Sequence, residues 1–342
     1  MVTRRIFSTV LCVFERRISS SAMNFARFGF NSTTPVIKEI GKLLQPEDTI
    51  YPIGQVFIHR LFAYRGVVVL SANCKVEEKS AKNSDAGKTV IEKPFYQVLI
   101  HRGDWEYMGF PVNLTTYLGD GGTRQEKILT VIHGMDCVAQ EDILPIAAHE
   151  QRPIEHDLFD RIFVKVPREN ETSSEYKFVM HPELEKHSLT KQQNKWLSPY
   201  HVYKEVTNHI EVMATTFYLG TTAFGGQVKH LWRYVIRIHN LEPSKRVVLR
   251  ERNIKVFSLN NMHQMTGIGV VGTQPELSIT QPAFQFSSTV EFPHPKGGHL
   301  WGKFKMERVE DRSLFDVAIP SIVLESDDTR SEVYEKAENP TV

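Results

Sequence analysis

The chain has 342 residues, of which 41% are hydrophobic and 24% are charged, and its formal net charge at pH 7 is +1. This length allows two domains with separate cores, and the composition is typical of globular proteins. The small net charge excludes a global field that would draw the chain onto nucleic acid, and the sequence holds no apolar run of about 18 residues that would predict a membrane-spanning helix. The cysteines Cys12, Cys74 and Cys137 form no C-x-x-C pair, which argues against a disulfide framework and a zinc ribbon.

The N-terminal segment differs in composition from the rest of the chain. Up to Lys38 its only acidic residue is Glu15, and serines are frequent. Its arginines are Arg4, Arg5, Arg16, Arg17 and Arg27, and an apolar helical stripe contains Ile6, Val10, Val13 and Phe14. This pattern is typical of a mitochondrial presequence, and a disordered basic tail is the alternative. We therefore predict a presequence and flexible segment over residues 1–50, cleaved near Ile18–Ser21 or somewhat later, and residence in the mitochondrial matrix.

Strand-like sequence begins at Tyr51. Short β-branched or aromatic runs bounded by turn residues predict strands at Val56–Ile58, Gly66–Leu70, Phe95–Ile100 and Ile128–Ile132. The polar stretch Lys75–Lys93 predicts a flexible, solvated loop, and Gly119–Gly122 predicts a turn. Short strands with long polar excursions indicate a small SH3-like β-barrel over residues 51–165.

The segment 166–204 is predicted to connect two domains. Its apolar density falls and charges of both signs increase. Pro182 is followed by Leu184, Leu189 and Trp196, a spacing that indicates one or two short surface helices. We therefore expect a charged, partly helical connector.

Residues 205–326 show repeated period-two alternation. Apolar residues alternate with polar ones around Ile210 and Val212, Tyr234–Ile238, Val247 and Leu249, Phe284 and Phe286, and Phe315–Ile319. Such strands, separated by Pro, Gly and Asn turns, predict an antiparallel β-sandwich of the fibronectin or immunoglobulin type. The acidic and polar residues 327–342 are expected to fray.

Five arginines fall on the polar phase of two strands expected to be neighbours. They are Arg233, Arg237, Arg246, Arg250 and Arg252. Alternation would place them on one sheet face, as a basic stripe that could bind an acidic protein or a phosphate backbone. The alternative is an ordinary solvated face balanced by Glu242 and Glu251.

The glycines Gly267, Gly269 and Gly272 form a G-x-G-x-x-G string. A dinucleotide site needs this string between a strand and a helix, whereas Thr273–Glu276 and the following residues, including Pro282, open no helix. We therefore interpret it as a structural glycine loop inside the sandwich, with a nucleotide-binding enzyme as the alternative.

No catalytic or metal-binding constellation emerges from the sequence. The nearest histidine pairs are His149 and His156, His181 and His187, and His294 and His299, and none has metal-ligand spacing with a nearby cysteine or carboxylate cluster. The sequence also contains no G-x-S-x-G, S-x-x-K or P-loop string. We predict a non-enzyme without cofactor, metal or small-molecule substrate.

A peptide-like motif occurs near the first strand. Gln55, Ile58, Leu61 and Phe62 have the spacing of a sliding-clamp-binding peptide, with Leu61 in place of the first aromatic residue. Because these residues fall on a predicted strand, where they could not form a short docking helix, we expect core packing.

Two blocks of the sequence resemble known domain families. Gly54–Val56 through His59, Leu61, Tyr64 and Gly66–Val69, followed by Phe95–Val98, resemble the YccV (HspQ) family of small β-barrels. Tyr234–Asn240, Val248–Arg252, Gly267–Pro275, Gly298–Gly302 and Phe315–Pro320 resemble the ApaG domain, in order over roughly 115 residues. The order presequence, YccV, connector and ApaG is similar to the family of polymerase delta-interacting proteins.

This resemblance implies a fibronectin-like ApaG sandwich, no catalytic activity, and mitochondrial residence with the nucleus as a second location. It implies partners among the DNA polymerase delta small subunit, the sliding clamp, other polymerases and the mitochondrial Clp protease system. We therefore predict a non-enzymatic adaptor for replication, repair or protein quality control. A DNA-binding protein acting through the arginine stripe is the rival hypothesis.

Overall fold

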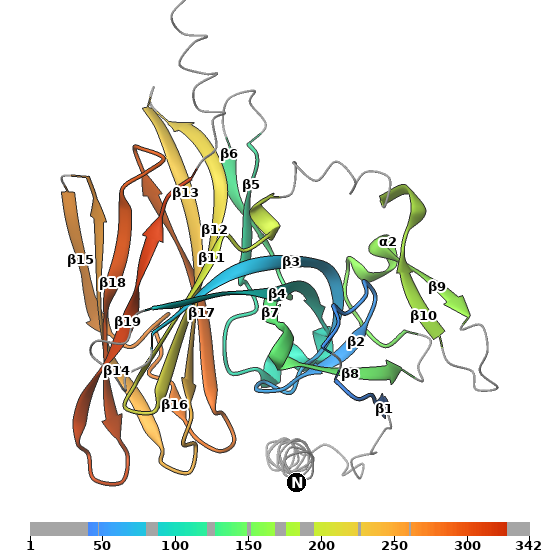
Figure 1. Cartoon of the computed structure of the whole chain (residues 1–342), viewed down its shortest axis with the longest axis horizontal. Coiled ribbons are helices and arrows are strands. Elements are labelled where there is room, and N and C mark those ends of the chain that lie inside the picture. The colour runs from blue at the N-terminus through green and yellow to red at the C-terminus, as the bar shows by residue number, and fades with distance from the viewer. Residues whose placement is uncertain are drawn as a thin grey trace, which may run out of the picture. The chain divides into compact units, whose positions relative to one another are not determined.

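The computed structural model describes residues 40–46, 48–79, 88–121, 127–148, 152–167, 176–184, 195–224, 227–259 and 261–326. Strands dominate these residues, so the predicted mainly β fold is confirmed (Figure 1). The described residues divide into two compact units. Unit 1 contains those up to Ser71, Tyr96–Gly109 and those of 136–189, and unit 2 contains Ala72–Phe95, Phe110–Met135 and those from residue 190 onward. The predicted presequence and the tail 327–342 lie outside the described residues.

The strands of unit 1 form an open sheet. Its strands are β1 (Gly41–Leu43), β2 (Val56–His59), β7 (Met135–Ala139), β8 (Ile143–Ala148), the first part of β3 (Arg65–Lys79) and the last part of β4 (Thr89–Ile100). They follow the order β1-β8-β2-β3, with β4 pairing β3 and β7. Phe57, Tyr64 and Ile100 have no exposed surface and lie in its core.

The described strands of unit 1 do not form a closed barrel. Among them, β1 pairs only with β8 and β7 pairs only with β4, so the path does not close. The 3-10 helix η2 (Gln140–Asp142) separates β7 from β8, and the two strands then pair with different neighbours. A second 3-10 helix, η1 (Arg102–Tyr107), follows β4.

The region expected to be a partly helical connector contains a β-hairpin. Helix α2 (Phe159–Ile162) is a single turn and leads into β9 (Phe163–Pro167), which pairs antiparallel with β10 (Tyr176–Met180). Phe159 lies 5.3 Å from Phe163 and 5.4 Å from Phe178 between ring centroids. This aromatic cluster supports the hairpin. Within the predicted connector, residues 182–184 are helical, as expected after Pro182, and the 3-10 helix η3 (Lys195–Leu197) follows.

The first sheet of unit 2 joins the second part of β3 to β11 (His201–Thr207), β12 (Ile210–Phe224), β13 (Gln227–Asn240) and β17 (Ala283–Phe292), in that order. β11 runs parallel to β3, with Val202 opposite Val76, and Lys79 forms a 2.9 Å ion pair with Glu205. The loop predicted over Lys75–Lys93 is therefore too long, because β3 reaches Lys79 and β4 begins at Thr89.

The second sheet of unit 2 has the order β15-β14-β18-β19. These strands are β14 (Val247–Ser258), β15 (Asn261–Ile268), β18 (Gly298–Arg308) and β19 (Leu314–Leu324), and β16 (Glu276–Leu277) also pairs with β14. All pairings within this sheet are antiparallel. A hairpin of β5 (Thr115–Asp120) and β6 (Lys127–Ile132) completes the unit.

The two sheets of unit 2 pack against each other. Phe286 of β17 lies 6.4 Å from Phe304 of β18 between ring centroids. The Tyr203 hydroxyl donates a 3.2 Å hydrogen bond to the Val323 carbonyl, and burial raises the pKa of this tyrosine to about 12. The alternation read from the sequence therefore corresponds to two layers around a shared core, antiparallel except for the β3–β11 pair.

Candidate functional site

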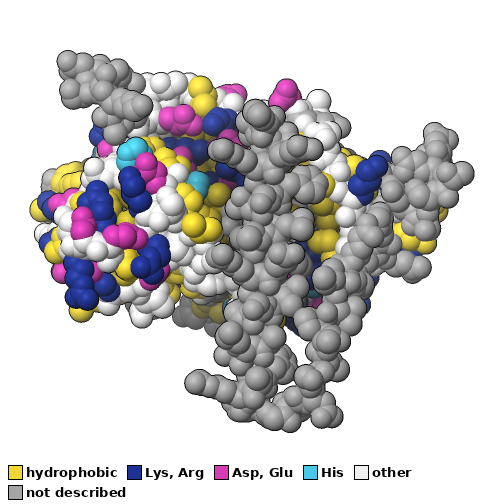
Figure 2. All heavy atoms as spheres, turned by 90° about the horizontal axis from the view of Figure 1, so that it is seen from below, with side chains coloured by type: hydrophobic (Ala, Val, Ile, Leu, Met, Phe, Trp, Pro, Cys, Tyr) yellow, Lys and Arg dark blue, Asp and Glu magenta, His cyan; other side chains and the backbone are white. Residues whose placement is uncertain are grey.

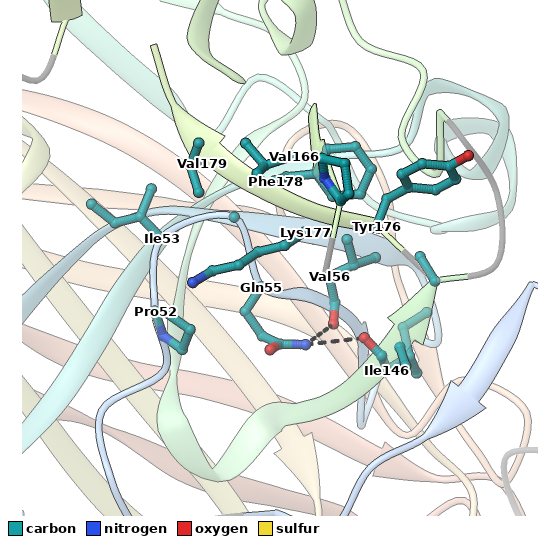
Figure 3. Close-up of a pocket in the computed structure, with 14 residues that line it drawn as sticks. Pro52, Ile53, Gln55, Val56, Ile146, Val166, Tyr176, Lys177, Phe178 and Val179 are labelled. Atoms are coloured by element: carbon teal, nitrogen blue, oxygen red, sulfur yellow. Dashed lines mark hydrogen bonds between the residues drawn. The ribbon is translucent and has the colours of Figure 1, made fainter. Parts of the chain in front are cut away.

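Unit 1 contains a groove whose lining residues all belong to that unit. It has a volume of about 500 Å³ and is lined by residues 52–56, the end of β8 and the β9–β10 hairpin (Figure 3). The lining residues are Pro52, Ile53, Gly54, Gln55, Val56, Ile146, Ala147, Ala148, Val166, Pro167, Tyr176, Lys177, Phe178 and Val179. Most of these residue types are apolar, but the accessible lining is divided about equally between polar and apolar atoms.

The groove begins where β2 separates from β8. The ladder between these strands ends with Phe57 opposite Pro145, although β8 continues to Ala148. The Leu44 N–H donates to the Pro145 carbonyl on the β1 side, so alternation directs the backbone groups of Ile146 and Ala148 toward the β2 side. This short length of β8 therefore has a strand edge facing the groove.

The Gln55 side chain occupies part of that gap. Its Nε2 donates to the carbonyl oxygens of Val56, at 2.7 Å, and of Ile146, at 3.0 Å (Figure 3). The amide thus bridges the two strands where their backbones no longer pair. In the sequence, Gln55 is part of the clamp-like motif and of the block that resembles the YccV family. In the structure Ile58 lies on the extended strand β2 and Phe62 is buried, which agrees with the expected core packing rather than a docking helix.

The wall formed by β10 depends on Gly54. This residue has a φ of +87°, and a Cβ built on it would lie 1.9 Å from the Phe178 carbonyl oxygen. Only glycine permits both the left-handed backbone and the close approach. The turn at residues 52–55 and strand β10 therefore pack backbone to backbone, and this contact sets the position of the hairpin.

Lys177 is the one charged side chain that lines the groove. Its side chain extends across the groove toward Pro52 and Gln55 (Figure 3). Within the described part of the chain, no carboxylate forms an ion pair with it. A groove with a mixed polar and apolar lining, a strand edge and one cation suits an extended peptide that carries apolar residues and a carboxylate.

The predicted arginine stripe is divided between the two sheets of unit 2. Arg233 and Arg237 lie on β13 of the first sheet and are 1% and 3% exposed. The Arg233 Nη1 donates a 3.0 Å hydrogen bond to the Thr116 carbonyl of β5, and its guanidinium lies 3.8 Å from the Phe217 ring centroid. β13 is buried on both faces, so its polar phase is interior.

The other three arginines lie in the second sheet or directly before it, and each contacts a carboxylate or a backbone carbonyl. Arg246 lies 3.5 Å from Glu276 and 3.6 Å from Glu310. Arg250 forms a 2.7 Å ion pair with Glu307, which raises the pKa of Arg250 and lowers that of Glu307. Arg252 donates a 2.7 Å hydrogen bond to the Gly269 carbonyl.

The expectation of one continuous basic stripe is therefore wrong, because residues 241–246 carry the chain from one sheet to the other. The carboxylates beside Arg246 and Arg250 are Glu276, Glu310 and Glu307, not the predicted Glu242 and Glu251. On the face shown in Figure 2, dark-blue Lys and Arg side chains are interspersed with magenta Asp and Glu side chains at its left end.

The glycine string lies in a β setting. Gly267 is in β15, Gly269 and Gly272 have φ values of +59° and +74°, and Val270 forms a bridge with Thr273. The next element is the two-residue strand β16, so no helix N-terminus meets the loop. A Cβ on Gly269 would lie 1.9 Å from the Thr273 carbonyl oxygen. The geometry is that of a turn and does not form a phosphate-binding βα unit.

Among the described residues, no group of three or more His, Cys, Asp or Glu could hold a metal ion. His149 and His187 lie outside the described residues. Burial, with a contribution from Glu92, raises the pKa of the Cys74 thiol to about 12, so this thiol is protonated at neutral pH. No described helix is long and apolar enough to cross a membrane.

Comparison with known families matches both parts of the chain. Residues 49–170 match the family described as "Hemimethylated DNA-binding protein YccV like", and residues 225–308 match the ApaG domain. ApaG of Paramagnetospirillum magneticum is 34% identical over 125 residues, which cover 36% of this chain and 94% of that protein. These matches define a class of protein that joins a YccV-like to an ApaG domain.

Polymerase delta-interacting protein 2 of Homo sapiens and that of Mus musculus are each 34% identical to this chain over 309 residues. The alignment covers 85% of this chain and 80% of each relative. The chain belongs to the polymerase delta-interacting protein 2 family. The resemblance read from the sequence motifs is confirmed.

Proposed function

We propose that this protein is a non-enzymatic adaptor that holds an extended segment of a partner protein in the unit 1 groove. The observation that supports this most is the combination of the groove, the edge of β8 at Ile146–Ala148 and the cation of Lys177. A peptide strand added to β8 would displace the Gln55 amide from the Ile146 carbonyl, form backbone hydrogen bonds in its place, put apolar side chains in the groove and pair a carboxylate with Lys177. The rigid walls keep the ordering cost of binding low.

The family supplies the candidate partners. The relatives are named for interaction with polymerase delta, and we propose that its small subunit is the first partner to test. The sliding clamp, other polymerases and mitochondrial Clp protease components are further proposed partners, as the sequence resemblance implies.

We further propose that residues 1–50 direct the protein to the mitochondrial matrix, with a nuclear pool in addition. The basic, acid-poor composition of residues 1–38 supports this proposal. Uptake of a reporter fused to residues 1–50 by isolated mitochondria is the test, and a reporter that stays outside contradicts it. The domain boundaries drawn at residues 51–165 and 205–326, and the SH3-like and fibronectin-like assignments, are likewise proposals.

Reversing the charge in the groove should weaken partner binding. For Lys177→Glu, we expect the dissociation constant for the purified polymerase delta small subunit to rise about tenfold, because the partner carboxylate then meets a like charge. Lys127→Glu on β6 is the matched control, since Lys127 is also exposed and lies outside the groove. Isothermal titration with the full chain measures both.

Equal affinities of Lys177→Glu and the wild-type protein would contradict the groove as the docking site. DNA binding is the rival outcome. A labelled duplex that binds with steep salt dependence, while the polymerase subunit does not bind, would favour the nucleic-acid function over the adaptor.

A further inference from the structure

Strand β15 forms an unprotected edge of the second sheet of unit 2. It pairs with β14 on one side, and no described strand pairs with its other side (Figure 1). Seven of its eight residues are exposed. The groove of unit 1 plays no part in this edge, which is therefore independent of the proposed function.

The direction of the backbone groups follows from one hydrogen bond. The Gly269 N–H donates to the Arg250 carbonyl at 2.8 Å, so odd-numbered residues of this strand direct their N–H and C=O groups toward β14. The even-numbered residues direct theirs to the open edge, and they are Met262, Gln264, Thr266 and Ile268.

The usual devices that block edge pairing are missing from β15. Natural edge strands carry charged side chains, proline or bulges. The sequence of β15, NMHQMTGI, contains no Lys, Arg, Asp, Glu or Pro, and its register with β14 has no bulge. Ile268 is 73% exposed and Met262 is 59% exposed, so the edge also presents apolar surface.

The strand is complementary to a second copy of itself. In an antiparallel pair centred on Met265, Met262 lies opposite Ile268 of the other copy and Gln264 lies opposite Thr266. All four of these positions direct their backbone groups to the shared edge, which provides about eight interchain hydrogen bonds. Each exposed apolar side chain then meets another apolar side chain, and no like charges oppose each other.

We propose that β15 pairs with β15 of a second copy of this chain, with Met265 at the two-fold axis, to form a continuous sheet across two molecules. An uncharged strand has no electrostatic preference for a charged partner segment, and the register matches like side chains, so a second copy fits better than an unrelated peptide. The contact is narrow, so the dimer dissociates on dilution.

A cysteine placed at the axis tests this register. The test uses the Cys12→Ser/Cys137→Ser background. In the proposed register, Met265→Cys places the two introduced cysteines opposite each other as a non-hydrogen-bonded pair. Their Cα atoms are then about 4.5 Å apart, which is within the range that a disulfide can bridge. Met262→Cys is the matched control, because Met262 is more exposed than Met265 (59% against 38%) but lies far from its own copy in this register. After mild oxidation, a non-reducing gel should show about tenfold more dimer for Met265→Cys.

Equal amounts of disulfide dimer for the two variants, or none for Met265→Cys, would overturn the proposal. Thr266→Pro provides a second test with no cysteine. The Thr266 N–H faces the open edge, so proline there leaves the ladder with β14 intact and removes an interchain donor. Analytical ultracentrifugation should show a concentration-dependent dimer for the wild-type chain and a monomer for Thr266→Pro. Identical sedimentation of the two, whatever the state, would also overturn the pairing.

Discussion

Arg233→Glu should unfold unit 2, with a loss of more than about 4 kcal/mol in the free energy of unfolding. Arg233 is 1% exposed, donates to the Thr116 carbonyl and lies against the Phe217 ring. The substitution removes the donor and buries a carboxylate beside a carbonyl oxygen and a ring face, both of which repel it. Urea denaturation monitored by tryptophan fluorescence measures the effect, because Trp232 directly precedes Arg233 and is fully buried.

Arg250→Glu is the control for this prediction. Arg250 lies in the partly exposed layer of the second sheet and pairs with Glu307, so we expect only a small change in the urea midpoint. If the two variants lose the same stability, Arg233 does not occupy the interior position described here. A stable Arg233→Glu protein that lost only partner binding would instead restore Arg233 as a surface contact.

Gly54→Ala should be the second most damaging change, with a loss of about 3 kcal/mol. The new Cβ would lie 1.9 Å from the Phe178 carbonyl oxygen, and the residue must keep a φ of +87°. The backbone of β10 has to move, which widens or closes the groove. We therefore expect lower stability and weaker partner binding in the same variant.

Gly272→Ala separates the two causes of that loss. Gly272 also has a positive φ, +74°, but a Cβ there would meet nothing within 4 Å. The free energy of unfolding of this control should fall by only about 1 kcal/mol, which is the cost of holding an alanine at a positive φ. Thermal unfolding of the two variants under one set of conditions gives the difference. Equal losses of stability in the two variants would show that the close approach of Gly54 to Phe178 does not contribute to the free energy of unfolding.

The sequence carried enough information to predict most strands of unit 2. Alternation around Tyr234–Ile238 and Phe315–Ile319 marked β13 and β19, because one buried face of a strand repeats every second residue. No helix-like sequence follows Gly272, and in the structure Gly267 lies in β15 while Gly269 and Gly272 have positive φ values after it. The motifs of both domain families were recognisable for the same reason, as they record backbone and core constraints.

The sheet to which each strand belongs could not be read from alternation. Arg233 and Arg252 have the same polar phase, but β13 and β14 lie in different layers, and both faces of β13 are buried. In the sequence pattern, a buried arginine on such a strand cannot be distinguished from a solvent-exposed one, because burial depends on the neighbouring strands. The five-arginine stripe failed for this reason, and not because the strands were misplaced.

The groove was missed because it depends on contacts between distant segments. Gln55 meets Ile146 across 91 residues, and Gly54 meets Phe178 through the backbone. Lys177 falls in a stretch that was expected to be a charged connector, where one more lysine carries no signal. Gly54, which precedes the first strand predicted from the sequence, was the one available hint of a close backbone approach.

Photocrosslinking from the groove tests the adaptor account most directly. A benzoylphenylalanine placed at Val166, which is 39% exposed and lines the groove, is compared with one placed at Val131 of β6, which is 36% exposed and lies outside it. With the polymerase delta small subunit present, we expect a crosslink from position 166 to one extended, acid-containing segment of the partner, and none from position 131. Crosslinks from position 131 alone, or equal crosslinks from both, would contradict docking in the groove.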